Sequence, residues 1–230
     1  MEKNELNIIK EGKTGHGILI ENDGFMFLKE KTIKESLEDG GWNVPHPFIV
    51  DAVFQKFGVK NANGRIYPEE VLKKQVEIYQ QKINERRALG ELNHPAESTI
   101  DLDRIAINII ELHWEGRTLV GKLEINTSYG FRKHGIVSTR GDQMANLLLN
   151  GYKIGVSSRG VGSVEQKLGQ YIVGDDFELI CWDVVSDPST PGAYVGSQEE
   201  LMQYLESDNN KNNKLAINEK IFKIKSILNS

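Results

Sequence analysis

Residues 155–162 have the sequence Gly-Val-Ser-Ser-Arg-Gly-Val-Gly, which places two hydroxyl groups, one Arg and three glycines within eight positions. Ser and Gly at this density ordinarily indicate a loop or a turn. A nucleophile with backbone N–H donors close by is the alternative, because a simple turn has little need for Ser-Ser-Arg. The stretch follows a helical pattern and precedes two strand patterns, so it lies where helical and extended parts of the chain meet.

The composition of the chain limits its size class and its partners. The 230 residues are 39% hydrophobic and 27% charged, which suits one domain with tails. The net charge is −5 with both signs interspersed, so we expect no nucleic-acid partner. The single cysteine, Cys181, excludes an internal disulfide and fits a reducing compartment. No apolar run reaches the roughly 18 residues of a membrane span, and no signal peptide is recognisable, so we expect an intracellular protein without a membrane partner.

Strand patterns outnumber helical patterns along the chain. Runs rich in β-branched and aromatic residues predict strands at 48–57, 105–112, 118–125, 169–173 and 177–186. Apolar residues at helical spacing predict helices at 68–87, 142–150 and 199–206, with a short one near 33–38. Residues 126–138 are predicted to form a polar loop. Together these patterns predict an α+β, β-rich fold.

Composition also divides the chain into three parts. Residues 1–47 form an N-terminal segment in which glycines interrupt short strands, and 48–206 contain the predicted domain. Residues 207–214 are polar and of low complexity, which is typical of a linker. Residues 215–230 regain helical periodicity and carry lysines, so 207–230 are predicted to be a linker and a basic tail helix.

His94 is the candidate general base. None of the five histidines has a second His four residues away, so the spacing of a zinc hydrolase is absent and no metal site is predicted. A lone His is ordinarily structural, but His94 lies between Asn93 and Pro95 at the end of a short extended segment. Glu91 is a candidate to orient its imidazole, and a His with a fixed tautomer is suited to general-base catalysis.

Ser157 is the candidate nucleophile, with two alternatives left open. The segment lacks the second Gly of the G-x-S-x-G nucleophile elbow, which argues against an α/β-hydrolase. Lys153 lies four residues before Ser157 and keeps a Ser–Lys dyad open. Ser158 is the rival nucleophile, and in an extended chain its side chain would point to the opposite face.

Asp183 interrupts an apolar run that extends from Leu179 to Val185. An acid inside a buried strand is costly unless it is paired. Two interpretations remain open from the sequence. Either strand alternation places Asp183 on the solvent face, or its carboxylate accepts a hydrogen bond from His94.

Four separated segments together resemble one protein family. They are Asn-Ala-Asn-Gly-Arg-Ile-Tyr-Pro at 61–68, Gly-Glu-Leu-Asn-His-Pro at 90–95, Gly-Val-Ser-Ser-Arg-Gly at 155–160 and Asp-Val-Val-Ser-Asp-Pro-Ser at 183–189. Their order and spacing resemble the prohead proteases of tailed phages, in particular those of large contractile-tailed myophages. These proteases are related to the herpesvirus assemblins. The resemblance covers roughly residues 48–195.

The resemblance implies a fold, an activity and a setting. The fold would be a herpesvirus-protease-like β-barrel, closed or nearly closed, surrounded by helices. The protein would be a serine endopeptidase, without a cofactor, that cuts scaffold or core proteins and the major capsid protein during head maturation. It would be made in the host cytoplasm as a zymogen, packaged inside the prohead, and would process itself. Homo-oligomerisation stays open, because the herpesvirus relatives act as dimers.

The resemblance also assigns roles to single residues. It places the nucleophile on Ser157, the general base on His94 and the third triad member on Asp183. Two other acids, Asp187 and Glu178, lie close enough in the sequence to compete with Asp183 for that third role.

The glycine-rich turn expected after the nucleophile is the candidate oxyanion site. Backbone N–H groups of Ser158, Arg159 and Gly160 would receive the oxyanion there, and the Arg159 side chain would add positive charge.

Enzymes of the myophage type favour an apolar residue two positions before a Glu, in the pattern Ile/Leu-x-Glu, and cut after that Glu. In the N-terminal segment and the tail, Ile-x-Glu triplets end at Glu11, Glu35 and Glu219. We therefore expect self-trimming after Glu11 or Glu35 and after Glu219, which would make part of 1–47 a pro-region and remove most of the basic tail.

Two other functions stay open from the sequence. The first is a non-catalytic capsid core or scaffold protein with the same fold, which would use the tail helix for interaction. The second is a cellular Ser–Lys peptidase, in which Lys153 would matter more than His94.

Overall fold

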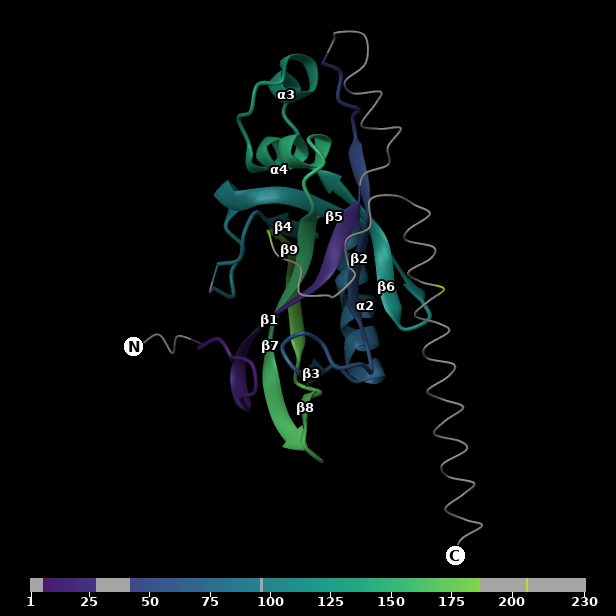
Figure 1. Cartoon of the computed structure of the whole chain (residues 1–230), viewed down its shortest axis with the longest axis vertical. Helices are drawn as coiled ribbons and strands as arrows, with labels where there is room; N and C mark the ends of the chain where they lie inside the picture. The colour runs from purple at the N-terminus through teal and green to yellow at the C-terminus, as the bar shows by residue number, and fades with distance from the viewer. Residues whose placement is uncertain (1–5, 28–41, 96, 187–205, 207–230) are drawn as a thin grey trace, which may run out of the picture.

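The structure, a computed structural model, describes residues 6–27, 42–95, 97–186 and 206. Within these residues the chain forms an α+β structure rich in strands, as the sequence predicts (Figure 1). The predicted helix near 33–38, most of the helix at 199–206, and the linker and tail at 207–230 lie outside the described residues. The strands are β1 Gly15–Phe27, β2 Phe48–Lys56, β3 Arg65–Ile66, β4 Leu89–Glu91, β5 Ile105–Glu115, β6 Thr118–Ile125, β7 Ile154–Lys167, β8 Gln170–Val173 and β9 Glu178–Val185. The helices are α2 Glu69–Asn84, the 3-10 helix η2 Leu102–Arg104, α3 Tyr129–His134 and α4 Arg140–Leu149.

One nine-stranded sheet organises the described residues. Its continuous path runs β3-β8-β7-β1-β2-β6-β5-β4, and β9 pairs with β7 beside this path. In Figure 1, α3 and α4 lie together at one end of the molecule and β3 and β8 lie at the other. The predicted pair of strands at 105–112 and 118–125 is present as the antiparallel pair β5 and β6.

The two sides of the sheet approach each other without forming the continuous closed barrel that the resemblance implies. In the described part of the chain, β4 continues to one parallel bridge with β9, between Leu92 and Val184. The N–H of Asn93 also donates to the carbonyl of Val184 at 2.8 Å. A closed barrel requires strand pairing around the whole ring, and this join is one bridge long. Its importance is local, because it anchors the residue that precedes His94.

β1 is a long strand where the sequence predicts short pieces. Its 13 residues pair with β7 from Gly15 to Met26, and its last residues also pair with β2. Ile18 and Leu19 are buried, and pairing with neighbouring strands compensates for the glycines that weaken the local strand signal. The sequence boundary at residue 47 therefore falls within one sheet, since β1 precedes it.

β7 runs through the stretch at 155–162, where the sequence favoured a loop or turn. The strand pairs with β1 on one side and with β9 on the other over most of these residues. A Cβ at Gly160 would lie 2.3 Å from a ring carbon of Phe177. The turn prediction is wrong because this glycine permits close packing within the sheet and does not change the direction of the chain.

α2 is the predicted amphipathic helix, and it follows Pro68 directly. Tyr79 on its inner face packs edge-on against Trp182 of β9, with the ring centroids 4.9 Å apart. Trp182 is fully buried and also packs against Phe54 of β2. The helix therefore fixes the strand that carries Asp183. The buried residues of α2 are Val71, Leu72, Gln75, Val76, Tyr79 and Ile83.

α3 lies inside the stretch at 126–138, which the sequence predicts to be a loop. Ser128 caps it by accepting a hydrogen bond from the N–H of Phe131, and Gly135 ends it in the left-handed conformation, with φ 69°. The helix has six residues, which is too short to show an apolar period in the sequence. In the described part of the chain, no helix is long and apolar enough to cross a membrane.

α4 corresponds to the predicted helix at 142–150 and begins with a capping box of Thr139 and Asp142. Burial alone would raise the pKa of Asp142, but backbone N–H groups of Ser128, Ser138 and Thr139 donate to its carboxylate and hold the pKa below its ordinary value. This carboxylate therefore contributes stability at neutral pH that is lost as the pH falls through its folded-state pKa. It ties the start of α4 to the start of α3.

Candidate active site

The structure brings Ser157, His94 and Asp183 together from three separate parts of the chain. Ser157 on β7 and Asp183 on β9 are directly opposite each other in the antiparallel pair. His94 lies in the segment after β4, with Nδ1 2.9 Å from Oδ2 of Asp183 and Nε2 in a short contact with Oγ of Ser157. A proton on Nδ1 satisfies the carboxylate and leaves Nε2 to accept the Ser157 hydroxyl. A hydroxyl, an imidazole and a carboxylate in series can, as a chemical arrangement, transfer the hydroxyl proton to the imidazole.

The backbone around His94 is fixed by close contact between β4 and β9. A Cβ at Gly90 would lie 2.1 Å from the carbonyl oxygen of Trp182, so only glycine allows this approach. Asn93 adopts a left-handed conformation, with φ 67°, which Asn tolerates better than most residues. Its N–H donates to the carbonyl of Val184 at 2.8 Å. These two features turn His94 toward the strand that carries Asp183.

Asp183 is fully buried and paired, which decides between the two interpretations left open by the sequence. Its Oδ1 accepts the N–H of Glu91 at 2.9 Å, and its Oδ2 lies 2.9 Å from both Nδ1 of His94 and Nε of Arg159. Burial alone would raise the pKa of Asp183, but the hydrogen bond with His94, the charge of Arg159 and the Glu91 N–H outweigh it and lower the pKa. The carboxylate is therefore ionised at neutral pH.

Arg159 lies behind Asp183 and is fully buried. Its Nη1 donates to the carbonyls of Glu97 and Thr99 at 2.7 and 3.2 Å, and its Nη2 donates to Oε1 of Glu91 at 2.9 Å. Burial alone would lower the pKa of this guanidinium, but its acidic neighbours raise it, so it stays charged. The expectation that Arg159 adds charge to an oxyanion site is wrong, because its side chain is occupied by Asp183 and Glu91.

The backbone at Ser158, Arg159 and Gly160 does not form the turn that the oxyanion proposal required. These residues lie within β7, each opposite a residue of β1 and, apart from a register shift between Arg159 and Gly160, opposite residues of β9. In a strand paired on both sides the N–H groups serve the sheet. The predicted oxyanion cradle is therefore not supported at this position.

The rival site residues lie away from the three-residue contact. Ser158 faces the opposite side of β7 from Ser157, as expected for an extended chain. Lys153 is exposed and precedes β7, whereas Ser157 is fully buried. Glu178 is exposed at the start of β9. Asp187 lies outside the described residues.

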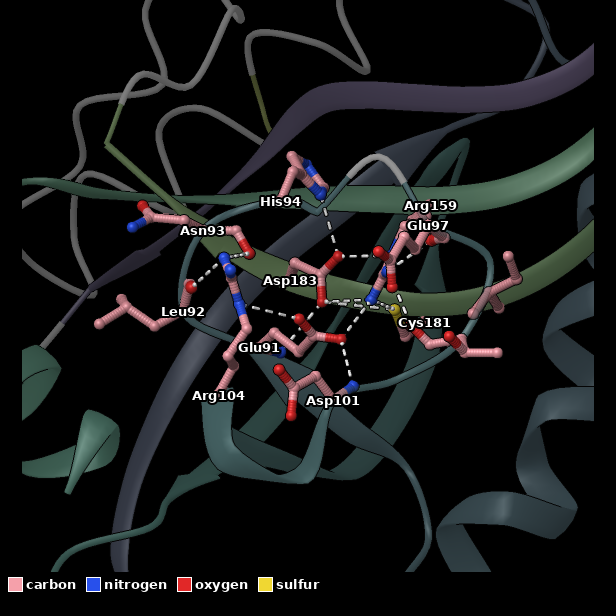
Figure 2. A network of polar contacts seen from close by, with 12 residues as sticks. Glu91, Leu92, Asn93, His94, Glu97, Asp101, Arg104, Arg159, Cys181 and Asp183 are labelled. Carbon is pink, nitrogen blue, oxygen red and sulfur yellow. Dashed lines mark hydrogen bonds and ion pairs between the residues drawn. The ribbon is translucent and has the colours of Figure 1, made fainter. Parts of the chain in front are cut away.

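Glu91 does not orient His94 directly, as the sequence suggested. Its carboxylate is fully buried and contacts Arg159 at 2.9 Å and Nε of Arg104 at 3.2 Å, and it accepts the N–H of Asp101 at 2.9 Å. Figure 2 shows the resulting series of contacts from Arg104 through Glu91 and Arg159 to Asp183 and His94. The sequence signal for this series was present, since Glu91 and Arg159 both belong to the segments that carry the resemblance.

Comparison with known proteins assigns the chain to a family. The family described as "Prohead core protein serine protease" matches residues 12–204. The chain belongs to this family. It is therefore a protease of phage head assembly, and the resemblance found in the sequence is confirmed.

A curated sequence and a solved structure from phage T4 are similar to this prohead protease. The chain is 35% identical over 153 residues to the prohead core protein protease of Enterobacteria phage T4, which covers 65% of this chain and 68% of the relative. The solved structure of the bacteriophage T4 capsid assembly protease, gp21, superposes with a TM-score of 0.59 at 28% identity. That match covers 74% of this chain and 98% of the T4 chain.

A second buried cluster supports β1 of this protease from the opposite side of β7. Glu21 on β1 is fully buried and lies opposite Ser158. Its carboxylate forms a 2.6 Å ion pair with Nη1 of Arg65 and accepts the hydroxyl of Tyr67 at 2.9 Å. Amide groups of Asn61 and Asn63 also donate to it at 2.7 Å. The conspicuous segment at 61–68 is thus explained by one buried acid far from it in sequence.

The protease has a small pocket directly beside the segment that carries His94. It measures about 190 Å³ and is lined by Leu92, Asn93, Arg104, Arg140 and Gln143. Arg104 is held by Glu91 and by the carbonyls of Leu92 and Asn93. Arg140 donates to Gln143 at 3.2 Å and has no acidic partner among the described residues, so it is the cation available to a ligand. No cluster of three or more His, Cys, Asp or Glu side chains suited to a metal ion occurs within the described ranges.

Proposed function

We propose that this protease is a serine endopeptidase in which Ser157 is the nucleophile, His94 the general base and Asp183 the acid that orients His94. The observation that supports this most directly is the unbroken series of contacts from Oγ of Ser157 through the imidazole to Oδ2 of Asp183. Ser158 lies on the other face of β7, so only one of the two serines has a base beside it.

The proposed mechanism follows from these contacts. Nε2 of His94 accepts the proton of Ser157 as Oγ attacks the scissile carbonyl, and it later gives that proton to the leaving amine. Asp183 keeps the Nδ1 proton in place and stabilises the imidazolium that forms. Water then attacks the acyl-enzyme with His94 again as the base, which frees Ser157.

The setting is proposed from the relatives. The similar phage T4 sequence is described as a prohead core protein protease, and the similar T4 structure as a capsid assembly protease. By extension, the substrates of this chain are phage scaffold or core proteins and the major capsid protein, cut inside the prohead. The sheet would correspond to the barrel of the herpesvirus enzymes, but with its two sides joined only by the single bridge between Leu92 and Val184.

The alternatives fit the site less well. A non-catalytic core protein has no need for a buried hydroxyl, an imidazole and a carboxylate in series, because burying polar groups is costly. A Ser–Lys peptidase would need the Lys153 side chain beside Ser157. Lys153 immediately precedes β7 and is exposed, whereas Ser157 is fully buried.

Covalent labelling tests the proposed nucleophile. We expect a fluorophosphonate reagent to modify Ser157 in a preparation that cleaves its scaffold substrate, because only a serine activated by a base reacts readily. Peptide mass spectrometry would locate the adduct. Ser158→Ala should still be labelled, whereas His94→Ala should not. An adduct on Ser158, or labelling unaffected by His94→Ala, would contradict the assignment.

We further propose that the pocket beside His94 binds the acidic side chain in the pattern Ile/Leu-x-Glu. Arg140 supplies the charge, and Gln143 and Asn93 add polar groups. A peptide with Gln in place of the Glu should lose about 10- to 100-fold in kcat/KM, the worth of a charged hydrogen bond. Arg140→Met should remove most of this discrimination in a parallel assay of both peptides. Equal discrimination by the wild type and Arg140→Met would show that the acid is recognised elsewhere.

The fold constrains the proposed self-cleavage sites. Glu11 is exposed, but Ile9 two residues before it is buried, and its N–H donates to the carbonyl of Ile18 at 3.0 Å. Cleavage after Glu11 therefore requires local release of this segment and leaves β1 in the chain. Cleavage after Glu35 would separate β1 from the rest of the protease. Glu35 and Glu219 themselves lie outside the described residues.

A further inference from the structure

We propose that Glu91 is a positioning residue of the protease: by compensating Arg159, it leaves Asp183 able to support the positive charge that forms on His94. This inference rests on the proposed function. It assigns a role to a buried acid that touches neither the nucleophile nor the base. The role is carried by an alternating series of charges, Arg104, Glu91, Arg159 and Asp183, in which each neighbour is in contact with the next.

One oxygen atom of Asp183 faces both His94 and Arg159. Oδ2 of Asp183 lies 2.9 Å from Nδ1 of His94 and also 2.9 Å from Nε of Arg159. When His94 takes the proton of Ser157, this oxygen faces two cations at once. Asp183 and Arg159 are fully buried, so water screens these charges little. A carboxylate shared in this way stabilises the imidazolium less than one that belongs to His94 alone.

Glu91 provides a second carboxylate for Arg159, so that Asp183 does not have to compensate Arg159 and the imidazolium alone. Its Oε1 lies 2.9 Å from Nη2 of Arg159, and its own N–H donates to Oδ1 of Asp183. The guanidinium thus bridges two carboxylates, and one of them does not touch His94. The formal charges of two carboxylates and one guanidinium in this buried group sum to one negative charge, which favours a positive charge on the adjacent imidazole.

Arg104 acts on the same series from its outer end. Its Nε lies 3.2 Å from Oε2 of Glu91, and 35% of its side chain is exposed. It therefore opposes Glu91, but solvent weakens its effect. Three other titratable groups lie around the site. Cys181 of β9 contacts Asp183 and Arg159 at 3.3 Å. Tyr79 of α2 packs against Trp182 of β9, and Asp101 caps the start of η2. Burial raises the pKa of Cys181, so its thiol stays neutral.

The test compares the pH profile of kcat/KM in the full-length protease for Glu91→Gln, Arg104→Gln and the wild type. Glu91→Gln keeps the shape of the side chain and its ability to accept the N–H of Asp101. We expect kcat to fall about tenfold and the acid limb of the profile to move to lower pH by roughly 0.5–1 unit. Arg104→Gln should move the acid limb by less and in the opposite direction, and Arg104→Lys should restore it.

Shifts of the acid limb in opposite directions for Glu91→Gln and Arg104→Gln distinguish an electrostatic role of Glu91 from a structural one. A loosened loop would lower activity but would not move the acid limb in a direction that depends on the charge removed. A profile for Glu91→Gln that coincides with the wild type, in an enzyme that Ser157→Ala inactivates, would overturn this inference and leave the proposed function standing. Activity that survives Ser157→Ala would overturn the proposed function itself. Denaturant unfolding of each variant checks that the comparison is made on folded protein.

Discussion

Ser157→Ala should abolish proteolysis, with kcat for cleavage of a scaffold substrate falling by on the order of 10⁵–10⁶-fold. The physical reason is the loss of the only hydroxyl that contacts Nε2 of His94 among the described residues. The stability of the protein should change little, because Ala fills nearly the same volume in the buried strand. Co-expression with a scaffold substrate, followed by gel and mass analysis of the products, measures the effect.

Ser158→Ala is the matched control for this variant. Ser158 is the next residue on the same strand and is equally buried, but its hydroxyl has no hydrogen-bond partner among the described residues. Its replacement should leave cleavage within a few-fold of the wild type and should not lower stability, because an unsatisfied buried hydroxyl contributes nothing. Loss of cleavage in Ser158→Ala with activity kept in Ser157→Ala would reverse the assignment.

A comparison of the wild type with Ser157→Ala also tests self-trimming. Mass spectrometry should find intact termini in Ser157→Ala and shortened ones in the wild type, at Glu11 or Glu35 and at Glu219. Identical termini in both proteins would show that the protease does not process itself at these sites.

The Ser–Lys alternative is tested by two other variants. Loss of activity in Lys153→Ala, with activity retained in His94→Ala, would favour a Ser–Lys mechanism.

Arg159→Met should destabilise the fold by about 3–5 kcal/mol, because it leaves two buried carboxylates without their shared cation. Asp183 and Glu91 are both fully buried and both contact Arg159. Urea unfolding at neutral pH measures the change. Arg140→Met provides the control, since this exposed arginine should cost at most about 0.5 kcal/mol.

Two further measurements sharpen this prediction. Adding Glu91→Gln to Arg159→Met should cost less than the sum of the single changes, because it removes one of the uncompensated charges. The difference in the free energy of unfolding between the wild type and Arg159→Met should also become smaller at acid pH. The lowered pKa of Asp183 gives the wild type stability that is present at neutral pH and is lost as the pH falls through that pKa. A stability difference that does not depend on pH would indicate that Arg159→Met destabilises the fold through lost packing and not through lost charge.

Much of the fold was accessible from local patterns. The helix α2 and the pair β5 and β6 follow from apolar periodicity, since each buries one face on a common core. The same patterns failed for β1, β7 and α3. Glycines weaken the local strand pattern of β1 and β7, and the close contacts that these glycines permit come from strands distant in sequence. The helix α3 has too few residues to show an apolar period.

The candidate site divides in the same way. The order of residues indicated which chemistry was available: a serine, a histidine and an acid in segments that resemble one family. It also predicted Ser158 on the opposite face from Ser157 in an extended chain. The extended conformation of 155–162 became evident from the pairing of β7 with strands that are distant in sequence. Contacts between distant segments also assign Arg159 to Asp183 and Glu91, in place of an oxyanion. The reason is physical, because Arg159 meets Glu91 across 68 residues and His94 meets Asp183 across 89, and no local periodicity encodes such partners.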